Sequence, residues 1–66
     1  MIKINGQEFH FADSKSISKV FLENNIETPK GIAVALNNKV IPRLKWDEQL
    51  VQQSDNILII KATQGG

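Results

Sequence analysis

Residues 32–46 read IAVALNNKVIPRLKW. In the first five residues larger apolar side chains alternate with Ala33 and Ala35, which predicts a strand that carries both alanines on one face. Asn37-Asn38 predicts a turn, and a short strand, KVI, follows it. The next residue is a proline, which ends that strand because it has no N–H to donate to a ladder of hydrogen bonds. The stretch therefore predicts two strands joined by a turn.

The N-terminal segment predicts a β-hairpin. MIKIN and QEFHF each alternate apolar and polar residues, as strands with one buried face do. Asn5-Gly6 stands between them and favours a type I′ turn, because both residues tolerate positive φ. His10 is expected within the second strand, facing solvent between two phenylalanines, and is not expected to act as a general base.

The segment ADSKSISKVFLENN, which follows the hairpin, predicts one short helix. Each of three residues can offer a side-chain oxygen to the first helical turn: Asp13, Ser14 and Ser16. Apolar residues recur at i, i+3 and i+4 on one helical face: Ile17, Val20 and Phe21. Polar Asn24 and Asn25 continue that face, so the helix has two to three turns and needs a sheet to lie on.

The C-terminal part predicts a crossover and a last strand. RLKWDEQLVQQSDN has no sustained period and allows one helical turn, whereas ILIIKAT is typical of a strand. The element order is β-β-α-β-β-β, which predicts an α+β fold with a mixed sheet of about four to five strands on one short helix. We expect residues 1–61 to form this domain and residues 62–66 to form a flexible tail.

One face of the predicted sheet has no helix to cover it. If Ile57 and Ile59 face the helix, Leu58 and Ile60 face the other way, beside the two alanines should those strands be neighbours. An open apolar patch of this kind on a small protein often marks a partner site. The alternative is a central last strand whose two faces are both covered by loops.

The composition argues against several classes of protein. The 66 residues include no cysteine and one histidine, so neither a disulfide nor a zinc site is expected. Eight basic and seven acidic residues give a net charge of +1, and the lysines do not cluster, which argues against a nucleic-acid surface. There is no run of 18 apolar residues and no signal peptide, so we expect a soluble cytoplasmic protein without a membrane partner.

The sequence contains no recognisable catalytic constellation. Asp47 and Glu48 are the one adjacent carboxylate pair, and neighbours at i and i+1 do not face each other on a helix, which favours a solvated turn. There is neither a nucleophile motif nor a phosphate-binding loop. The protein is therefore expected to hold no metal and not to be an enzyme.

The last two residues, Gly65 and Gly66, indicate a role as a substrate of other enzymes. The tail would present the α-carboxylate of Gly66, which another enzyme could activate by adenylation with ATP. Glycine suits this role because, without a Cβ, it passes through a narrow channel and leaves the acyl carbon unhindered.

The element order and the Gly-Gly end resemble the ubiquitin-like β-grasp domains. Within that group the chain resembles, over all 66 residues, the bacterial thiamin-biosynthesis sulfur carriers of the ThiS family. The resemblance rests on IAVALNNKVIPRLKW, where the asparagine turn leads through a short apolar strand to Pro42, Arg43 and Trp46. QSDNILII, which leads to the Gly-Gly end, matches as well, whereas Ala62-Thr63-Gln64 is more polar than is usual in the family.

The resemblance implies a carrier that other enzymes charge and discharge. An E1-like adenylyltransferase of the ThiF type would adenylate Gly66 with ATP, and a cysteine desulfurase pathway would supply sulfur for a thiocarboxylate. Thiazole synthase, of the ThiG type, would then receive the sulfur, and the carrier itself would bind no cofactor. The residues expected to dock on both enzymes are those of the tail, Lys61, Ala62, Thr63, Gln64 and Gly65, and those of the open face, Ala33, Ala35, Leu58 and Ile60.

Other functions and two residue roles stay open. The chain could be a sulfur carrier for molybdopterin synthesis, a ubiquitin-like covalent modifier, or a β-grasp module that binds RNA or a ligand. Trp46 either plugs the edge of the core or lies at a partner interface. Arg43 pairs either with Asp47 or with a carboxylate of a partner.

Overall fold

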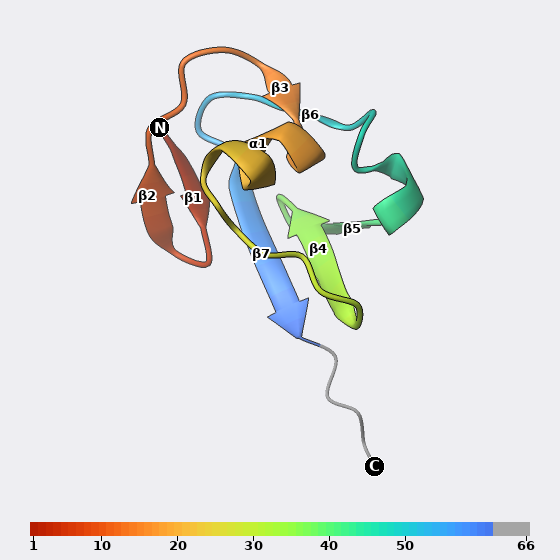
Figure 1. Ribbon diagram of the computed structural model, residues 1–66. Helices are drawn as coiled ribbons and strands as arrows, with labels where there is room; N and C mark the ends of the chain where they lie inside the picture. Colours follow the sequence, from red (N-terminus) through yellow and green to blue (C-terminus); the bar gives the residue numbers. More distant parts are fainter. Residues whose placement is uncertain (62–66) are drawn as a thin grey trace.

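The computed structural model describes residues 1–61, so the predicted tail, residues 62–66, lies outside the described residues. Figure 1 shows the arrangement of the elements. In chain order they are β1 (Ile2–Ile4), β2 (Gln7–Phe9), β3 (Lys15–Ser16), α1 (Ile17–Glu23), β4 (Ile32–Leu36), β5 (Lys39–Ile41), the 3₁₀ helix η1 (Arg43–Lys45), β6 (Leu50–Val51) and β7 (Asn56–Lys61).

Five strands form one mixed sheet in the order β2-β1-β7-β4-β5. The central strand, β7, runs parallel to β1 and antiparallel to β4, so Ile57 has Ile4 on one side and Leu36 on the other. α1 packs across one face of the sheet (Figure 1). The predicted α+β class, with a mixed sheet of about four to five strands on one short helix, is confirmed, and the main sheet has five strands.

A second sheet of two strands, β3 and β6, was not predicted. Lys15 pairs with Val51, and Ser16 pairs with Leu50. Each strand has only two residues, too few for alternation to be recognised in the sequence. This pairing attaches the crossover between β5 and β7 to the segment that leads into α1.

Asparagine occupies the turns of both hairpins in the main sheet. Asn5 and Gly6 have φ values of 53° and 81°, and Asn37 and Asn38 have φ values of 51° and 73°. Positive φ at both central residues is the type I′ geometry, whose twist matches that of paired strands. Both predicted turns are therefore confirmed, and they set the register of the two hairpins.

The prediction that His10 lies within the second strand is wrong, because β2 ends at Phe9. The chain then turns inward, burying Phe11, whose carbonyl oxygen accepts a hydrogen bond from Gln53 Nε2 at 2.6 Å. His10 is exposed, as expected. Burial of the second phenylalanine in the core thus takes precedence over continuation of the short edge strand.

Side chains and backbone groups cap both ends of α1. Ser16, one of the three predicted candidates, is the N-cap, and its Oγ accepts a hydrogen bond from the Lys19 N–H at 3.2 Å. Asn25 follows the C-terminus in the left-handed conformation, φ 57°, and the Ile26 N–H bonds to the Phe21 carbonyl at 2.9 Å. This Schellman-type end explains why the helix has only two turns.

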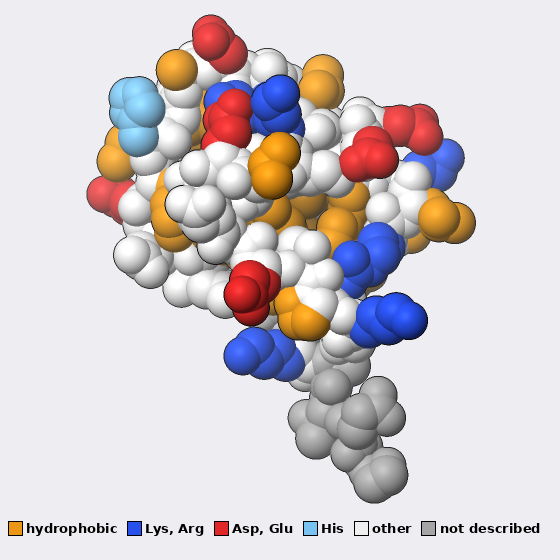
Figure 2. All heavy atoms as spheres, in the orientation of Figure 1, with side chains coloured by type: hydrophobic (Ala, Val, Ile, Leu, Met, Phe, Trp, Pro, Cys, Tyr) orange, Lys and Arg blue, Asp and Glu red, His pale blue; other side chains and the backbone are white. Residues whose placement is uncertain are grey.

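The core lies between α1 and the sheet. The helix contributes the predicted stripe of Ile17, Val20 and Phe21, all at most 2% exposed. The other buried members of this cluster are Ile2, Ile4, Phe11, Val34, Leu36, Ile41, Trp46, Val51 and Ile57. Charged side chains of both signs lie around the periphery of the face seen in Figure 2. The sheet is therefore packed on one face, as its alternating strands predict.

Candidate functional site

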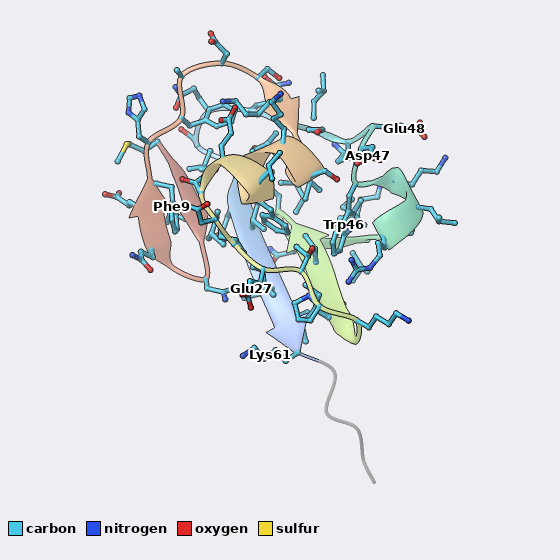
Figure 3. The ribbon with its side chains drawn as sticks, in the orientation of Figure 1. Phe9, Glu27, Trp46, Asp47, Glu48 and Lys61 are labelled. Atoms are coloured by element: carbon cyan, nitrogen blue, oxygen red, sulfur yellow. The ribbon has the colours of Figure 1, made fainter. Side chains whose placement is uncertain are left out.

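The predicted tail continues from the central strand. Lys61 is the last residue of β7, is exposed, and pairs with Ile32 at the start of β4. Figure 3 labels Lys61 at this end of the sheet. The tail residues predicted to act, Ala62, Thr63, Gln64, Gly65 and Gly66, lie outside the described residues. The site can therefore be built from the surfaces that surround Lys61.

The face of the sheet opposite α1 carries an open apolar surface. The register places Ala33 opposite Ile60 and Ala35 opposite Leu58, on the face away from the helix. Leu58 and Ile60 keep 47% and 43% of their surface exposed, whereas Ile57 is fully buried. The predicted orientation is confirmed. The alternative, loops covering both faces of a central strand, is wrong because β7 is central and these side chains remain exposed.

Val40 extends this surface and was not predicted. It lies opposite Ala35 across the β4–β5 hairpin and is 61% exposed. We call Ala33, Val40, Leu58 and Ile60 the outer apolar face. This position of Val40 could have been predicted from the sequence, because a two-residue turn at Asn37-Asn38 fixes the register that places Val40 opposite Ala35.

Ala35, predicted to belong to the partner face, offers little surface to a partner. Its side chain points to the outer face, but the residue is only 4% exposed. Its pairing partners, Val40 and Leu58, are larger and flank it on both sides. Ala35 therefore lies between two larger side chains on the outer side of the sheet and contributes little surface of its own.

Trp46 is a core residue, so of the two roles left open for it, the edge of the core and a partner interface, the interface role is wrong. The side chain is 4% exposed, and its Nε1–H donates a hydrogen bond to the Ile41 carbonyl oxygen at 2.8 Å. Its ring meets that of Phe21 edge to face, with centroids 5.9 Å apart and planes at 79°. The alternative that Trp46 plugs the edge of the core is confirmed.

Arg43 is exposed but is held by contacts within the chain. Its Nη1 and Nη2 donate to the carbonyl oxygens of Thr28 and Pro29 at 3.2 and 2.7 Å, and its guanidinium lies 4.4 Å from the centre of the Trp46 ring. The suggested pair with Asp47 is not formed. Arg43 therefore fastens the loop before β4 to the segment after β5, with a cation–π contact underneath.

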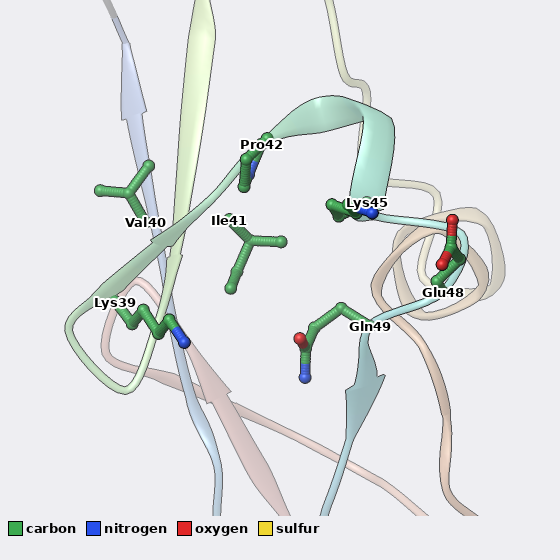
Figure 4. Close-up of a pocket in the computed structure, with 7 residues that line it drawn as sticks. All are labelled: Lys39, Val40, Ile41, Pro42, Lys45, Glu48 and Gln49. Carbon is green, nitrogen blue, oxygen red and sulfur yellow. The ribbon is translucent and has the colours of Figure 1, made fainter.

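The side chains that could suggest catalysis are dispersed among the described residues. Asp47 and Glu48 lie on the exposed turn after η1, as predicted (Figure 3). A groove of about 350 Å³ along the edge strand β5 is shown in Figure 4, and Lys39, Lys45 and Glu48 are its charged lining residues. Within residues 1–61 no group of three or more histidine, cysteine or carboxylate side chains could hold a metal ion.

One titratable group of the described chain has a shifted pKa with a clear cause. Lys15 Nζ lies 2.6 Å from Glu23 Oε1 and lowers the pKa of that carboxyl below its usual value. This ion pair joins β3 to the end of α1 and lies on the helix side of the molecule. It is a structural contact, not part of a reactive site.

Comparison with known proteins identifies the family. The family model described as "ThiS family" matches residues 2–66 of this chain. The chain belongs to the ThiS family. A curated relative, the sulfur carrier protein ThiS of Escherichia coli (strain K12), is 31% identical over 65 residues, covering 98% of this chain and 97% of the relative.

Solved structures support the ThiS fold. The crystal structure of the thiamine biosynthesis protein (ThiS) from Geobacter metallireducens matches with a TM-score of 0.81 at 21% identity, covering 98% of this chain and 97% of that chain. A solution structure of a thiamine biosynthesis protein from the same organism matches with a TM-score of 0.69 at 21% identity, over 98% and 86% of the two chains. The predicted β-grasp fold is therefore confirmed.

For this ThiS-family chain, each residue of the Pro-Arg and Trp pattern that carried the resemblance has a structural role. Pro42 follows the edge strand, Arg43 binds two loop carbonyls, and Trp46 closes the core. Leu58 and Ile60 of the outer apolar face, and Lys61 at the end of the same strand, remain exposed. Among residues 1–61 no helix has the length and apolar character needed to cross a membrane.

Proposed function

We propose that this protein is a sulfur carrier in the biosynthesis of the thiazole part of thiamin. The observation that carries the proposal is the match of the ThiS family model through residue 66, which includes Gly65 and Gly66. The E. coli relative, named as a sulfur carrier, aligns over nearly all of both chains. The carrier is a protein substrate in this proposal, because the chemistry is supplied by the enzymes that bind it.

The reactive group in this proposal is the α-carboxylate of Gly66. A carboxylate resists nucleophiles, so an adenylyltransferase of the ThiF type first joins it to AMP from ATP and releases pyrophosphate. The terminal sulfur of a cysteine desulfurase persulfide then displaces AMP and forms an acyl disulfide. A thiol cleaves this disulfide, which leaves the thiocarboxylate on Gly66 and a new disulfide between the thiol and the former persulfide sulfur. Thiazole synthase of the ThiG type receives this sulfur. Glycine at the end leaves the acyl carbon open to each of these nucleophiles.

The outer apolar face supports docking on these enzymes. Leu58 and Ile60 are exposed on the strand that leads to Lys61, and Val40 adds an exposed side chain nearby. A partner that covers this face would bury apolar area, which favours binding. The buried area would lie next to the start of the tail and would hold the tail near the partner. Modest affinity is expected, since a carrier must leave one enzyme before it meets the next.

The test is a high-resolution mass spectrum of the protein after reaction with ATP, an adenylyltransferase and a sulfur donor. Replacement of one oxygen by sulfur is expected, and fragmentation should place it on Gly66. Oxidation of methionine adds nearly the same mass, but the single methionine is residue 1, so the two products separate in the fragments. An unmodified Gly66 with competent enzymes would refute the proposal.

A matched pair of variants isolates the role of the terminus. One alanine added after Gly66 should abolish thiocarboxylate formation and leave the circular dichroism spectrum unchanged, whereas one alanine added before Met1 should leave both unchanged. Gly66→Ala should also reduce the rate of thiocarboxylate formation, because the added Cβ fits less well in the narrow channel of the enzyme.

If the sulfur is found on Gly66, addition of either thiazole synthase or molybdopterin synthase shows which of the two enzymes accepts it and so separates the two carrier functions. An isopeptide bond to another protein would instead identify a covalent modifier.

A further inference from the structure

Basic side chains border the end of β7. Lys61 pairs with Ile32, and Lys30 lies two residues before Ile32 on the loop into β4. The Arg43 guanidinium donates to the carbonyl oxygen of Pro29, the residue before Lys30, at 2.7 Å. We call Lys30, Arg43 and Lys61 the basic patch. Figure 2 shows lysine and arginine side chains gathered at the end of the molecule where the described chain stops.

This end of the molecule is positive although the chain as a whole is nearly neutral. The net charge is +1, from eight basic and seven acidic residues. The loop that carries Lys30 contributes one carboxylate, Glu27, whereas Asp47 and Glu48 lie on the turn after η1, away from Lys61 (Figure 3). Three cations and one carboxylate therefore lie around the start of the tail, a surplus that the linear sequence does not reveal.

The arginine of the basic patch is held in place before any partner binds. Its guanidinium stacks on Trp46, which is itself fixed by the hydrogen bond to the Ile41 carbonyl oxygen. Two loop carbonyls occupy two of its five N–H donors, and the residue remains exposed. A cation fixed in this way loses little conformational freedom on binding, so its charge is available at low entropic cost.

We infer that the basic patch docks on an acidic surface of the adenylyltransferase, at the entrance through which the tail reaches the active site. This inference rests on the proposed function. Lys61 pairs with Ile32, which packs against the core on the helix side, so the basic patch lies on the helix side of the sheet. The patch is beside the point where the tail begins and would face the enzyme that receives the tail. A nucleic acid fits less well, because strong phosphate binders typically make about 6–10 ionic contacts, more than this patch offers.

The physical role of the patch is to guide and orient the encounter. Complementary charges on two protein surfaces raise the association rate and favour one orientation, and salt screens the effect. The patch should therefore lower the KM for the carrier without changing kcat, since none of its side chains takes part in the proposed chemistry. Its effect should be large at low ionic strength and small at high ionic strength.

The test compares two double variants with the same loss of charge. Lys30→Gln/Lys61→Gln removes two cations from the patch, and Lys19→Gln/Lys39→Gln removes one from α1 and one from the far end of the β4–β5 hairpin. Adenylation is measured by the ATP–pyrophosphate exchange assay at about 20 and about 300 mM NaCl. At the lower concentration the surface charges are weakly screened, and at the higher one they are strongly screened. We expect the patch variant to raise KM by roughly tenfold at low salt, with kcat unchanged and the difference reduced at high salt. The control should stay within about twofold of the original protein.

The possible results separate this inference from the proposed function. Equal KM values for the original protein and the patch variant would overturn the basic patch alone, and so would an equal rise in the control, which would indicate a net-charge effect. Failure of the original protein to be adenylated at either salt concentration would overturn the proposed function and the patch with it. Binding of a fluorescent single-stranded RNA that the patch variant loses, without a change in KM, would assign the patch to nucleic acid.

Discussion

Trp46 shows how one side chain organises the edge of this small core. Its ring lies between Phe21 on one side and the Arg43 guanidinium on another, and its N–H satisfies the Ile41 carbonyl. A domain of 66 residues has few large side chains to bury, so a single tryptophan accounts for a large share of its apolar burial. We therefore expect the stability of the domain to depend strongly on this position.

Substitution of Trp46 should reduce the free energy of unfolding. Trp46→Ala should cost about 3–5 kcal/mol, because it leaves a cavity and removes the indole hydrogen bond. Trp46→Phe, which keeps a ring, should cost about 1–3 kcal/mol, as it leaves the Ile41 carbonyl without its donor. Urea unfolding followed by circular dichroism measures both. The control is Leu44→Ala, at an apolar residue that is 89% exposed, where the change should stay below about 0.5 kcal/mol.

The roles of single residues were predictable where the residue type restricts the environment. A lone tryptophan after a short strand favoured a place in the core, and its burial confirms this. Arg43 could not be placed in this way, because its partners are backbone carbonyls, which every residue of the chain possesses. Sequence patterns name candidate carboxylates such as Asp47 but do not show which loop will fold back onto a guanidinium.

The segment from β3 to α1 shows a contact between elements that depends on pH. Ser16 caps the helix, and the Lys15–Glu23 ion pair joins the strand before the helix to its last residue. Because Lys15 lowers the pKa of Glu23, the ionised carboxyl is favoured in the folded state. Its contribution to stability is present above the usual pKa of a glutamate and is lost as the pH falls through the lowered value.

Removal of the lysine should restore the usual titration of Glu23. In Lys15→Met, which keeps an unbranched side chain over Phe11, the pKa of Glu23 should rise towards its ordinary value. A pH titration of the Glu23 side chain by NMR measures this shift. Lys3→Met, on the far strand β1, should leave the Glu23 titration unchanged. Equal midpoints in the original protein and in Lys15→Met would contradict the role given to the ion pair.

At the scale of elements, turns and periodicity accounted for most of what could be predicted. Asn5-Gly6 predicted a type I′ hairpin, Asn37-Asn38 predicted a turn that proves to have the same geometry, and the i, i+3, i+4 stripe located the helix. The two-residue strands β3 and β6 escaped prediction because their pairing is a tertiary event without a local signature. The inward turn after Phe9 escaped it as well, since alternation continues through His10 and Phe11.

The whole molecule presents one covered and one open face, and its candidate site is only partly visible in the sequence. Alternation in the last strand predicted that Leu58 and Ile60 would face away from the helix. The basic patch was not predicted, because its lysines are 31 positions apart (61 minus 30) and only the β4–β7 pairing brings them together. A charge cluster made by tertiary structure therefore appears as scattered charge along the chain.

Docking through the outer apolar face predicts a selective loss of binding. Leu58→Gln should weaken binding to the adenylyltransferase by roughly tenfold, because it places a polar group within the apolar contact. Its free energy of unfolding should change by less than about 1 kcal/mol, since the side chain is 47% exposed. Isothermal titration calorimetry and urea unfolding measure the two effects. Leu22→Gln, on the exposed side of α1, is the control and should bind normally; an equal loss there would exclude a specific role for the outer face.

The central position of β7 also determines how the domain resists mechanical force. A pull on the chain beyond Lys61 acts along a strand that is bonded to β1 on one side and to β4 on the other. The hydrogen bonds to both neighbours would be loaded in shear and would have to break together, and β7 has two bonded neighbours where an edge strand has one. An unfoldase that pulls on this end would first have to separate the central strand from both of its neighbours. An enzyme that only binds and modifies this end can therefore do so while the domain stays folded.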